Sequence, residues 1–300
     1  MTTPMTRMTA PTAAHAGVAT DKPATAHAGS PAAATRAGMA HAMTIPFTVQ
    51  IRCREDSRGN AADRADAMIE RTLPALKAYL DHVDAVFSPF RADSAVSRAN
   101  RADWSALLDD PDFAEVYGLC ALAKRITDGH FDAAHAGGYD PVGIVKGWAV
   151  QRAHERFLMP LVRSGACEAA AIGGGGDVQT AVADGSDFLW RVGVQDPADP
   201  NATVRTIMLR DGAVATSGTS KRGEHIDRTA HDLAQATVVD DHLTFADMWA
   251  TTAIAAGETE FRRLLGLRGD ERAMAVLVRV DGSVATIGGS GGTHPSRSRA

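Results

Sequence analysis

The chain has 300 residues, a formal net charge of −5 and an apolar fraction of 45%. This composition excludes a fully disordered or collagen-like chain and is sufficient for one large domain or two small ones. No run of 18 apolar residues occurs, so no membrane-spanning helix is predicted. The mild acidity argues against a protein that is held by nucleic-acid phosphates. The three cysteines lie far apart, which favours reduced thiols over a disulfide framework or a zinc site.

The two ends of the chain differ in composition from its centre. Residues 1–43 are rich in Ala, Thr and His, and Val18 is their only branched aliphatic residue. Because such a segment cannot offset its ordering entropy by burial, we expect it to be disordered. It has no secretory apolar run of about 7–15 residues, so we expect a cytoplasmic protein. Residues 44–288 should form one domain, followed by a loose Gly/Ser/Arg-rich tail at 289–300.

Apolar periodicity predicts a mixture of helices and strands from residue 45 onward. The segment 45–52 alternates apolar and polar residues, as a strand does, whereas 62–86 keeps a helical period. We expect further helices at 112–127, 143–158 (ended by Pro160) and 245–256. Further strands are expected at 169–172, 190–195, 204–209, 213–216, 273–280 and 284–287. The strands are segregated from the helices, which favours an α+β fold over a doubly wound parallel sheet.

Two glycine-containing segments could bind a phosphate group. Lys146 follows the sequence DPVG and would lie in the first turn of a helix, where free N–H groups and an ammonium suit phosphate. An ordinary solvated lysine after a turn is the alternative. The sequence GGGGD at 173–177 follows an apolar strand and lets a backbone approach a ligand closely, or it forms only a tight turn. It matches neither a Rossmann nor a P-loop pattern.

Two further segments carry groups suited to catalysis or to metal binding. The segment 215–227 ends a strand with small hydroxyl residues and continues to His225, which could act as a base or be merely structural. Asp247 and Thr251 are four residues apart and would share one helix face. Their hard oxygens suit Mg²⁺ completed by substrate phosphates. Alternatively, the acid lies near a helix start and the threonine bonds its own backbone.

Taken in order, these segments resemble the ApbE family, the FAD:protein FMN transferases, over about residues 43–287. The resemblance implies an ApbE/T-fold-like architecture, with mixed antiparallel sheets and packed helices. Because the segment between Asp132 and Asp140 is short, the chain resembles a compact subgroup. The similar stretches are FSPF at 87–90 with Ser94, Ser97 and Asn100, GHFD at 129–132, DPVGIVKGW at 140–148, GGGD at 174–177, WRVGVQDP at 190–197, TSG at 216–218 and ADMWAT at 246–251.

The resemblance implies an activity and assigns roles to single residues. Family members bind FAD with Mg²⁺, attach FMN through a phosphoester bond to a threonine or serine of a target flavoprotein, and release AMP. The expected partners are therefore FAD and an acceptor flavoprotein, without nucleic acid or membrane insertion. By this analogy Mg²⁺ is held by Asp247, Thr251 and the backbone carbonyl of Gly143, FAD contacts Met43, His130, Phe131, Asp132, Lys146 and Ile226, and His225 accepts the hydroxyl proton.

One departure from the family pattern affects the histidine loop. The family sequence H-[IL]-x-DP-x-TG is reduced here to HIDRTA at 225–230, without its proline and glycine. A different loop path is therefore expected around His225 and Ile226. Three alternatives to FMN transfer remain: an FAD pyrophosphatase that forms FMN and AMP, a flavin-binding protein without catalysis, and an unrelated α+β protein.

Overall fold

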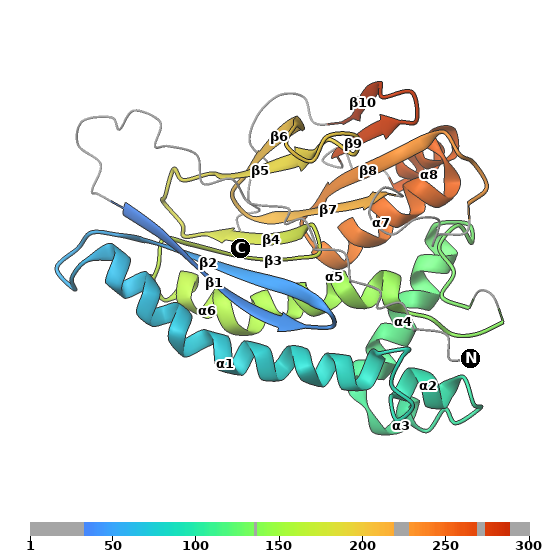
Figure 1. Ribbon diagram of the computed structural model, residues 1–300, viewed down its shortest axis with the longest axis horizontal. Helices are drawn as coiled ribbons and strands as arrows, with labels where there is room; N and C mark the ends of the chain where they lie inside the picture. Colours follow the sequence, from blue (N-terminus) through green and yellow to red (C-terminus); the bar gives the residue numbers. More distant parts are fainter. Residues whose placement is uncertain (1–32, 135–136, 219–227, 269–273, 289–300) are drawn as a thin grey trace, which may run out of the picture.

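The computed structural model describes residues 33–134, 137–218, 228–268 and 274–288, and these residues form a large antiparallel sheet covered by helices (Figure 1). The strand order is β1-β2-β3-β4-β7-β8-β9-β10, while β5 and β6 form a separate hairpin. The strands are β1 Ala33–Ala42, β2 Ile45–Arg54, β3 Ala169–Gly174, β4 Asp177–Val182, β5 Trp190–Gln195, β6 Thr203–Leu209, β7 Gly212–Gly218, β8 Leu233–Asp240, β9 Met274–Arg279 and β10 Val284–Ile287.

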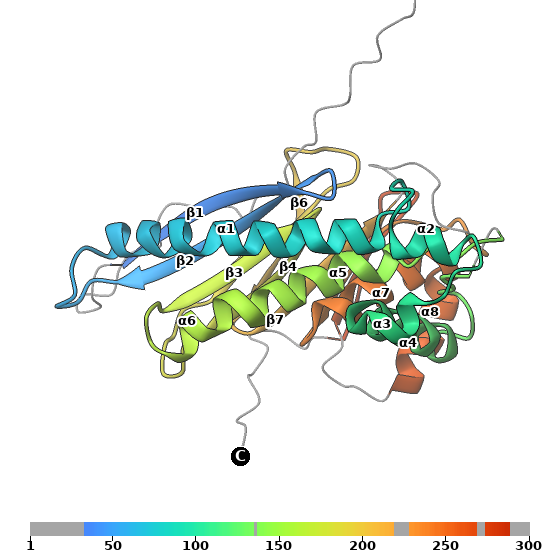
Figure 2. The same cartoon turned by 90° about the horizontal axis from the view of Figure 1, so that it is seen from below.

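The helices lie on one face of this sheet, and α1 and α5 run side by side across it (Figure 2). They are α1 Ala61–Phe87, α2 Ala95–Ala99, α3 Ala106–Asp109, α4 Pro111–Ile126, α5 Val142–Ala153, the π-helical turn η1 His154–Leu158, α6 Met159–Arg163, α7 Leu243–Ala256 and α8 Glu258–Arg268. The mixed helices and antiparallel strands confirm the predicted α+β class.

The sheet separates two hydrophobic clusters. Successive side chains of a strand point to opposite faces. Accordingly, Ala170 and Ile172 of β3 join the larger cluster beneath the helices, whereas Ala169 and Ala171 join a smaller one. Trp190 and its neighbours on the β5–β6 hairpin cover that second face. Both faces of β3 and β4 are therefore buried, which makes this central part of the sheet a rigid support for groups at its ends.

Strand β1 corrects the expectation that residues 1–43 are disordered. Residues 33–42 pair with β2 along their whole length, from Ala33 opposite Arg54 to Ala42 opposite Ile45. A Cβ atom on Gly38 would overlap Ile69 of α1, so small residues here allow the helix to approach closely. The strand is thus stabilised by its pairing and by α1 rather than by large apolar side chains of its own. Residues 1–32 and 289–300 lie outside the described residues.

The structure also changes the end of the helix that was expected to stop at Pro160. Helix α5 ends at Ala153 and is followed directly by the π-helical turn η1. Helix α6 comes next, with Pro160 in its first turn. Proline is tolerated there because the first N–H groups of a helix have no intrahelical partner. Sequence periodicity also missed β4, β8 and the helices α2, α3 and α8.

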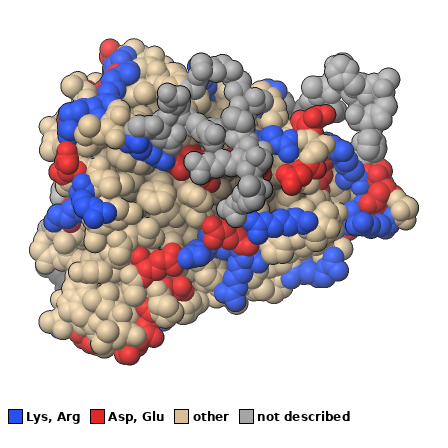
Figure 3. Space-filling view, turned by 180° about the vertical axis from the view of Figure 1, so that it is seen from behind, with Lys and Arg blue, Asp and Glu red and all other residues tan. Residues whose placement is uncertain are grey.

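Surface charge, helix hydrophobicity and the cysteines do not indicate a nucleic-acid-binding, membrane-spanning or disulfide-rich protein in the part of the chain that the structure describes. Acidic and basic side chains are interspersed on the face shown in Figure 3. Among the described helices, none has both the length and the apolar character that a bilayer span requires. Cys53, Cys120 and Cys167 are buried and unpaired, as expected for reduced thiols.

Candidate functional site

A buried cluster of one ammonium and two carboxylates joins α5, β4 and α7. Lys146 Nζ of α5 lies 2.7 Å from Asp177 Oδ2 of β4 and 3.4 Å from Asp247 Oδ1 of α7. The side chains of Asp177 and Asp247 are 0% and 2% exposed, and that of Lys146 is 18% exposed. Lys146 and Asp247, which are far apart in the sequence, therefore meet where screening by water is weak.

Backbone N–H groups hold both carboxylates in place. Gly147 N donates to Asp247 Oδ2 at 3.1 Å, and Thr216 N of β7 donates to Asp177 Oδ1 at 3.1 Å. A Cβ atom on Gly147 would lie 2.8 Å from the carbonyl oxygen of Leu243 and 2.9 Å from Asp247 Cβ. Only glycine lets α5 and α7 approach closely enough for this contact.

The electrostatics of the cluster favour the uptake of a further positive charge. Burial and the negative charge of Asp177 raise the pKa of Asp247, while Lys146 acts in the opposite direction. When all three groups are ionised, the cluster carries two negative charges and one positive charge. Asp177 Oδ2 is buried and faces the ammonium without a hydrogen bond of good geometry, so this oxygen is stabilised by charge.

Thr251 lies one turn after Asp247 on α7 and bonds across to the sheet. Its Oγ1 is 3.1 Å from Ser217 Oγ at the end of β7. The neighbouring Thr252 instead donates to the backbone oxygen of Met248 in its own helix, at 2.8 Å. The hydrogen bond from a threonine hydroxyl to the backbone of its own helix, which was the alternative for Thr251, is therefore made by Thr252. Thr251 and Ser217 thus place two hydroxyl oxygens between α7 and β7, one helical turn after Asp247.

The Asp247 carboxylate and these two hydroxyls are hard oxygen donors of the kind that could hold a magnesium ion completed by a substrate. The described residues contain no group of three or more His, Cys, Asp or Glu side chains with metal-binding geometry. Mg²⁺ is commonly held by one or two carboxylates together with substrate phosphates and water, which is the arrangement available here. Gly143 precedes Gly147 by one turn of α5, so its carbonyl belongs to the same end of that helix.

A turn of two glycines lies beside the Lys146 side chain. Gly175 and Gly176 connect β3 to β4 with φ angles of 63° and 100°, a region that favours glycine. A Cβ atom on Gly175 would lie 3.4 Å from both Lys146 Cδ and Ile45 Cδ1. The sequence GGGGD thus forms a hairpin turn beside the lysine stem and places Asp177 at the first position of β4.

Met43 lies in the neighbouring β1–β2 turn, at the same end of the sheet. Met43 and Thr44 form a two-residue turn in which both φ angles are positive, 48° and 62°. Two positive φ angles match the twist that short hairpins require. The position of Met43 near the glycine turn is compatible with its expected contact to FAD, which stays a prediction.

Phe131 of the segment 130–132 packs against the start of α5. A Cβ atom on Gly143 would lie 3.0 Å from Phe131 Cε2, so the buried ring packs directly on that helix end. Asp132 Oδ2 is 2.8 Å from Lys124 Nζ, and His130 Nε2 is 3.7 Å from Glu260 Oε1. These two polar residues therefore contact α4 and α8.

The remaining predicted residues, His225 and Ile226, lie outside the described residues. Conversely, sequence reasoning did not assign a role to Asp177 or Ser217, although both belong to motifs that had been noticed. The signal for Asp177 was an acid directly after a glycine turn, and the signal for Ser217 was a hydroxyl residue at a strand end. Their role becomes visible only when β4, β7 and α7 meet.

Comparisons with known proteins point to one family. The model of the ApbE family matches residues 43–139 and 135–278. The structure is similar to the flavin transferase ApbE from Vibrio cholerae, with a TM-score of 0.60 and 15% identity over 86% of this chain and 98% of that one. It also resembles the ApbE protein from Thermotoga maritima, with a TM-score of 0.61 and 18% identity over 84% of this chain and 96% of that one. A third similar structure is the Pseudomonas stutzeri flavinyl transferase ApbE, with a TM-score of 0.62 and 18% identity over 85% of this chain and 94% of that one. No curated protein sequence matches significantly.

Proposed function

This chain belongs to the ApbE family, and from that premise we propose that it transfers FMN from FAD to a threonine or serine hydroxyl of a target flavoprotein, with release of AMP. The observation that carries the proposal is the buried cluster of Lys146, Asp177 and Asp247, with Thr251 beside it. Structural neighbours are named flavin transferase and flavinyl transferase. A cytoplasmic enzyme with a soluble or cytosol-facing acceptor is part of the proposal.

The proposed substrate fits the charges and surfaces around this cluster. The ammonium of Lys146 would hold the diphosphate of FAD, because a compact positive charge is a strong phosphate partner. Asp177 orients that ammonium from a buried position. Phe131 would line the adenine-side pocket together with His130 and Asp132. Met43 and Ile226 are proposed as further contacts to the flavin nucleotide.

The metal would bind at the oxygen atoms of α7 and of the start of α5. We assign Asp247, Thr251 and the carbonyl of Gly143 as its protein ligands. When bound, Mg²⁺ supplies neutralisation of charge on the bridging phosphates, the main requirement of phosphoryl transfer. The raised pKa of Asp247 is consistent with this role, since a carboxylate that is short of positive charge gains most from a cation.

The transfer step exchanges the phosphoanhydride bond of FAD for a phosphoester bond to the acceptor. The hydroxyl oxygen of the acceptor attacks the phosphorus of the FMN half, and a new P–O bond forms there. The bond from that phosphorus to the bridging oxygen breaks, and AMP leaves with the electron pair. The hydroxyl proton passes to a base, for which His225 is our candidate.

The test is incubation of the protein with FAD, Mg²⁺ and a candidate acceptor flavoprotein, followed by intact-mass analysis and detection of AMP. We expect an acceptor that carries covalent FMN, and one AMP for each adduct. FMN and AMP without an adduct would indicate a pyrophosphatase. FAD that binds without release of AMP would indicate a non-catalytic flavin binder, and no binding of FAD would contradict the proposal.

A further inference from the structure

Helix α7, which carries Asp247 and Thr251, has its first N–H groups capped by other elements. The preceding residue, His242, makes no side-chain cap. Leu243 N donates instead to Gln179 Oε1 of β4 at 2.9 Å, and Thr244 N donates to Gln151 Oε1 of α5 at 3.2 Å. The first N–H groups of a helix have no intrahelical acceptor, so these two glutamines satisfy donors that would otherwise lack partners.

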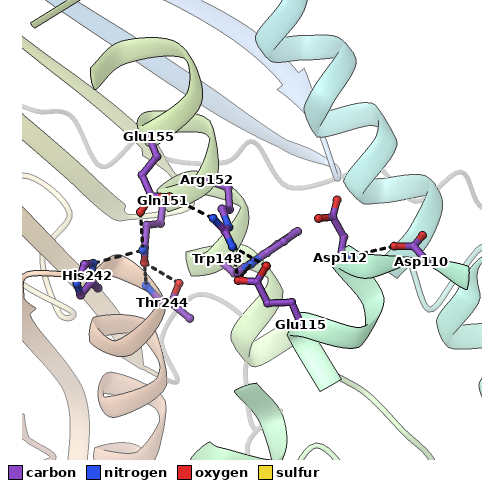
Figure 4. Close-up of polar contacts among 9 residues, drawn as sticks. All are labelled: Asp110, Asp112, Glu115, Trp148, Gln151, Arg152, Glu155, His242 and Thr244. Carbon is purple, nitrogen blue, oxygen red and sulfur yellow. Dashed lines mark hydrogen bonds and ion pairs between the residues drawn. The ribbon is translucent and has the colours of Figure 1, made fainter. Parts of the chain in front are cut away.

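Both glutamines are themselves held firmly. Gln179 is buried, and its Nε2 donates to the backbone oxygens of Gly212 at 3.2 Å and Asp241 at 3.1 Å. Gln151 also accepts from Thr244 Oγ1 at 2.7 Å and donates to Glu155 Oε1 at 2.9 Å. Figure 4 shows the Gln151 side chain pointing to the start of α7, between Thr244 and His242. Each cap is therefore a fixed acceptor rather than a loose surface contact.

The caps come from the same two elements that supply the partners of Asp247. Gln179 lies two residues after Asp177, so both side chains point to the helix-covered face of β4. Gln151 lies on α5, five residues after Lys146. A shift of α7 by one residue along its axis would move Asp247 by about 1.5 Å. Such a shift would break both caps and would change the contacts of Asp247 with Lys146 and Gly147.

We propose that Gln151 and Gln179 are positioning residues that fix α7 along its axis against α5 and β4, and so set where Asp247 and Thr251 present their oxygens. The structural part of this proposal stands on the hydrogen bonds alone. Its consequence for metal binding rests on the proposed function.

The chain offers a matched control on the next residue of α5. Arg152 points away from α7 and pairs with Glu115 of α4, as Figure 4 shows. Trp148 Nε1 donates to the same carboxylate at 3.2 Å. Arg152 also lies 3.5 Å from Glu155. A substitution of Arg152 therefore removes partly exposed contacts with Glu115 and Glu155, while the hydrogen bonds of Gln151 to Thr244 stay in place.

The experiment compares Gln151→Met, Gln151→Glu and Arg152→Met with the unaltered protein. The readouts are Mn²⁺ affinity in the presence of FAD, measured from the electron paramagnetic resonance signal of free Mn²⁺, and hydrogen exchange of amides 243–247. We expect Gln151→Met to weaken Mn²⁺ binding about tenfold, as the loss of an outer-shell partner does, and to speed exchange in α7. Arg152→Met should stay within about threefold. Gln151→Glu keeps the acceptor at a helix N-terminus but loses the bond to Glu155, so its affinity should lie between those of Gln151→Met and the unaltered protein.

The outcomes separate this proposal from the proposed function. Equal Mn²⁺ affinity and equal exchange in Gln151→Met and Arg152→Met would overturn the positioning role. If Gln151→Met does not fold, Thr244→Val replaces it, because it removes only the hydroxyl bond to Gln151 Oε1; unchanged affinity and exchange in that variant would also overturn the role. If the unaltered protein binds no Mn²⁺ with FAD, the proposed function fails, and the exchange data alone then decide whether Gln151 holds α7.

Discussion

The candidate site has an inner and an outer part that use the same kinds of charged residue in different surroundings. In the inner part, Lys146 meets Asp177 and Asp247 with carboxylates that are almost fully buried. By the outer part we mean the exposed ion pairs around the segment 128–132; there, Arg263 of α8 pairs with Asp128, and these side chains are 47% and 58% exposed. From this difference in exposure we expect burial, rather than the number of ion pairs, to decide how much each contact contributes.

The physical reason is the cost of removing charge from water. An exposed ion pair contributes about 0–1 kcal/mol, because water and salt screen it. Loss of one partner of a buried pair leaves a charge that cannot be solvated, which costs about 3–5 kcal/mol. Substitutions in the two parts should therefore differ in size by several-fold, and the following predictions test that difference from the largest effect to the smallest.

The largest effect is expected for Asp247→Ala. This change removes the carboxylate that we assign to the metal, so FMN transfer should fall by at least about a hundredfold. The measurement is the rate of adduct formation by mass spectrometry at saturating Mg²⁺. Asp128→Ala is the control from the outer part and should keep most of the rate. Transfer that continues normally in Asp247→Ala would refute the metal assignment.

Lys146→Met tests the inner part through stability. The variant leaves Asp177 and Asp247 buried with less positive charge, so the free energy of unfolding should fall by about 2–4 kcal/mol in urea titration at pH 8. The loss should be smaller at pH 6, because Asp247, whose pKa is already raised, can then take up a proton. Lys124→Met, which removes the exposed partner of Asp132, is the matched control. Equal losses of unfolding free energy in Lys146→Met and Lys124→Met would contradict the distinction between the inner and the outer part.

His154 sharpens the comparison with a buried group that lies outside the site. Burial lowers its pKa to about 4, and its Nε2 is buried without a hydrogen-bond partner among the described residues. The unfolded chain therefore binds this proton more readily. The contribution of neutral His154 to the free energy of unfolding is complete above about pH 6.5. It is lost as the pH falls towards 4, and the loss reaches up to about 3 kcal/mol.

The measurement for His154 is the unfolding free energy between pH 4 and 7 in the unaltered protein and in His154→Leu. The variant should have a flatter profile over this range. Parallel profiles would show that His154 is not responsible for acid sensitivity.

The smallest effect is expected for Arg263→Met in the outer part. This variant loses exposed pairs with Asp128 and Glu260, so stability should change by less than about 1 kcal/mol. The difference from the unaltered protein should shrink further in 0.5 M NaCl, where the Debye length falls to about 4 Å. Thermal unfolding at two salt concentrations measures it. A loss as large as that of Lys146→Met would show that the outer pairs are structural supports.

Most regular elements could be predicted because their own side chains carry the period. Helix α1 shows a repeating apolar face, and β5 was predicted with its observed ends, Trp190–Gln195. Strand β1 was missed because its residues are small and it depends on β2 and α1. Strand β4 was missed because Gln179 and Thr180 are polar although buried, and their bonds go to groups distant in the sequence.

The candidate site could be predicted only in part from spacing. Asp247 and Thr251 share a helix face by simple periodicity, whereas nothing in the spacing indicates that Lys146 lies beside Asp247. The family resemblance implied only that Lys146 contacts FAD and that Asp247 holds the metal; the structure places the two side chains 3.4 Å apart. Asp177 was left without a role because its partners, Lys146 and the Thr216 N–H group, come from α5 and β7.

The most direct test is a measurement of equilibrium FAD binding with and without Mg²⁺, in which flavin fluorescence reports the bound fraction. We predict that Mg²⁺ tightens FAD binding to the unaltered protein at least tenfold, about 1.4 kcal/mol, and that Asp247→Asn abolishes this gain while it keeps the fold. An equal gain in Asp247→Asn, or no effect of Mg²⁺ on the unaltered protein, would contradict a site in which Asp247 holds a metal against the diphosphate.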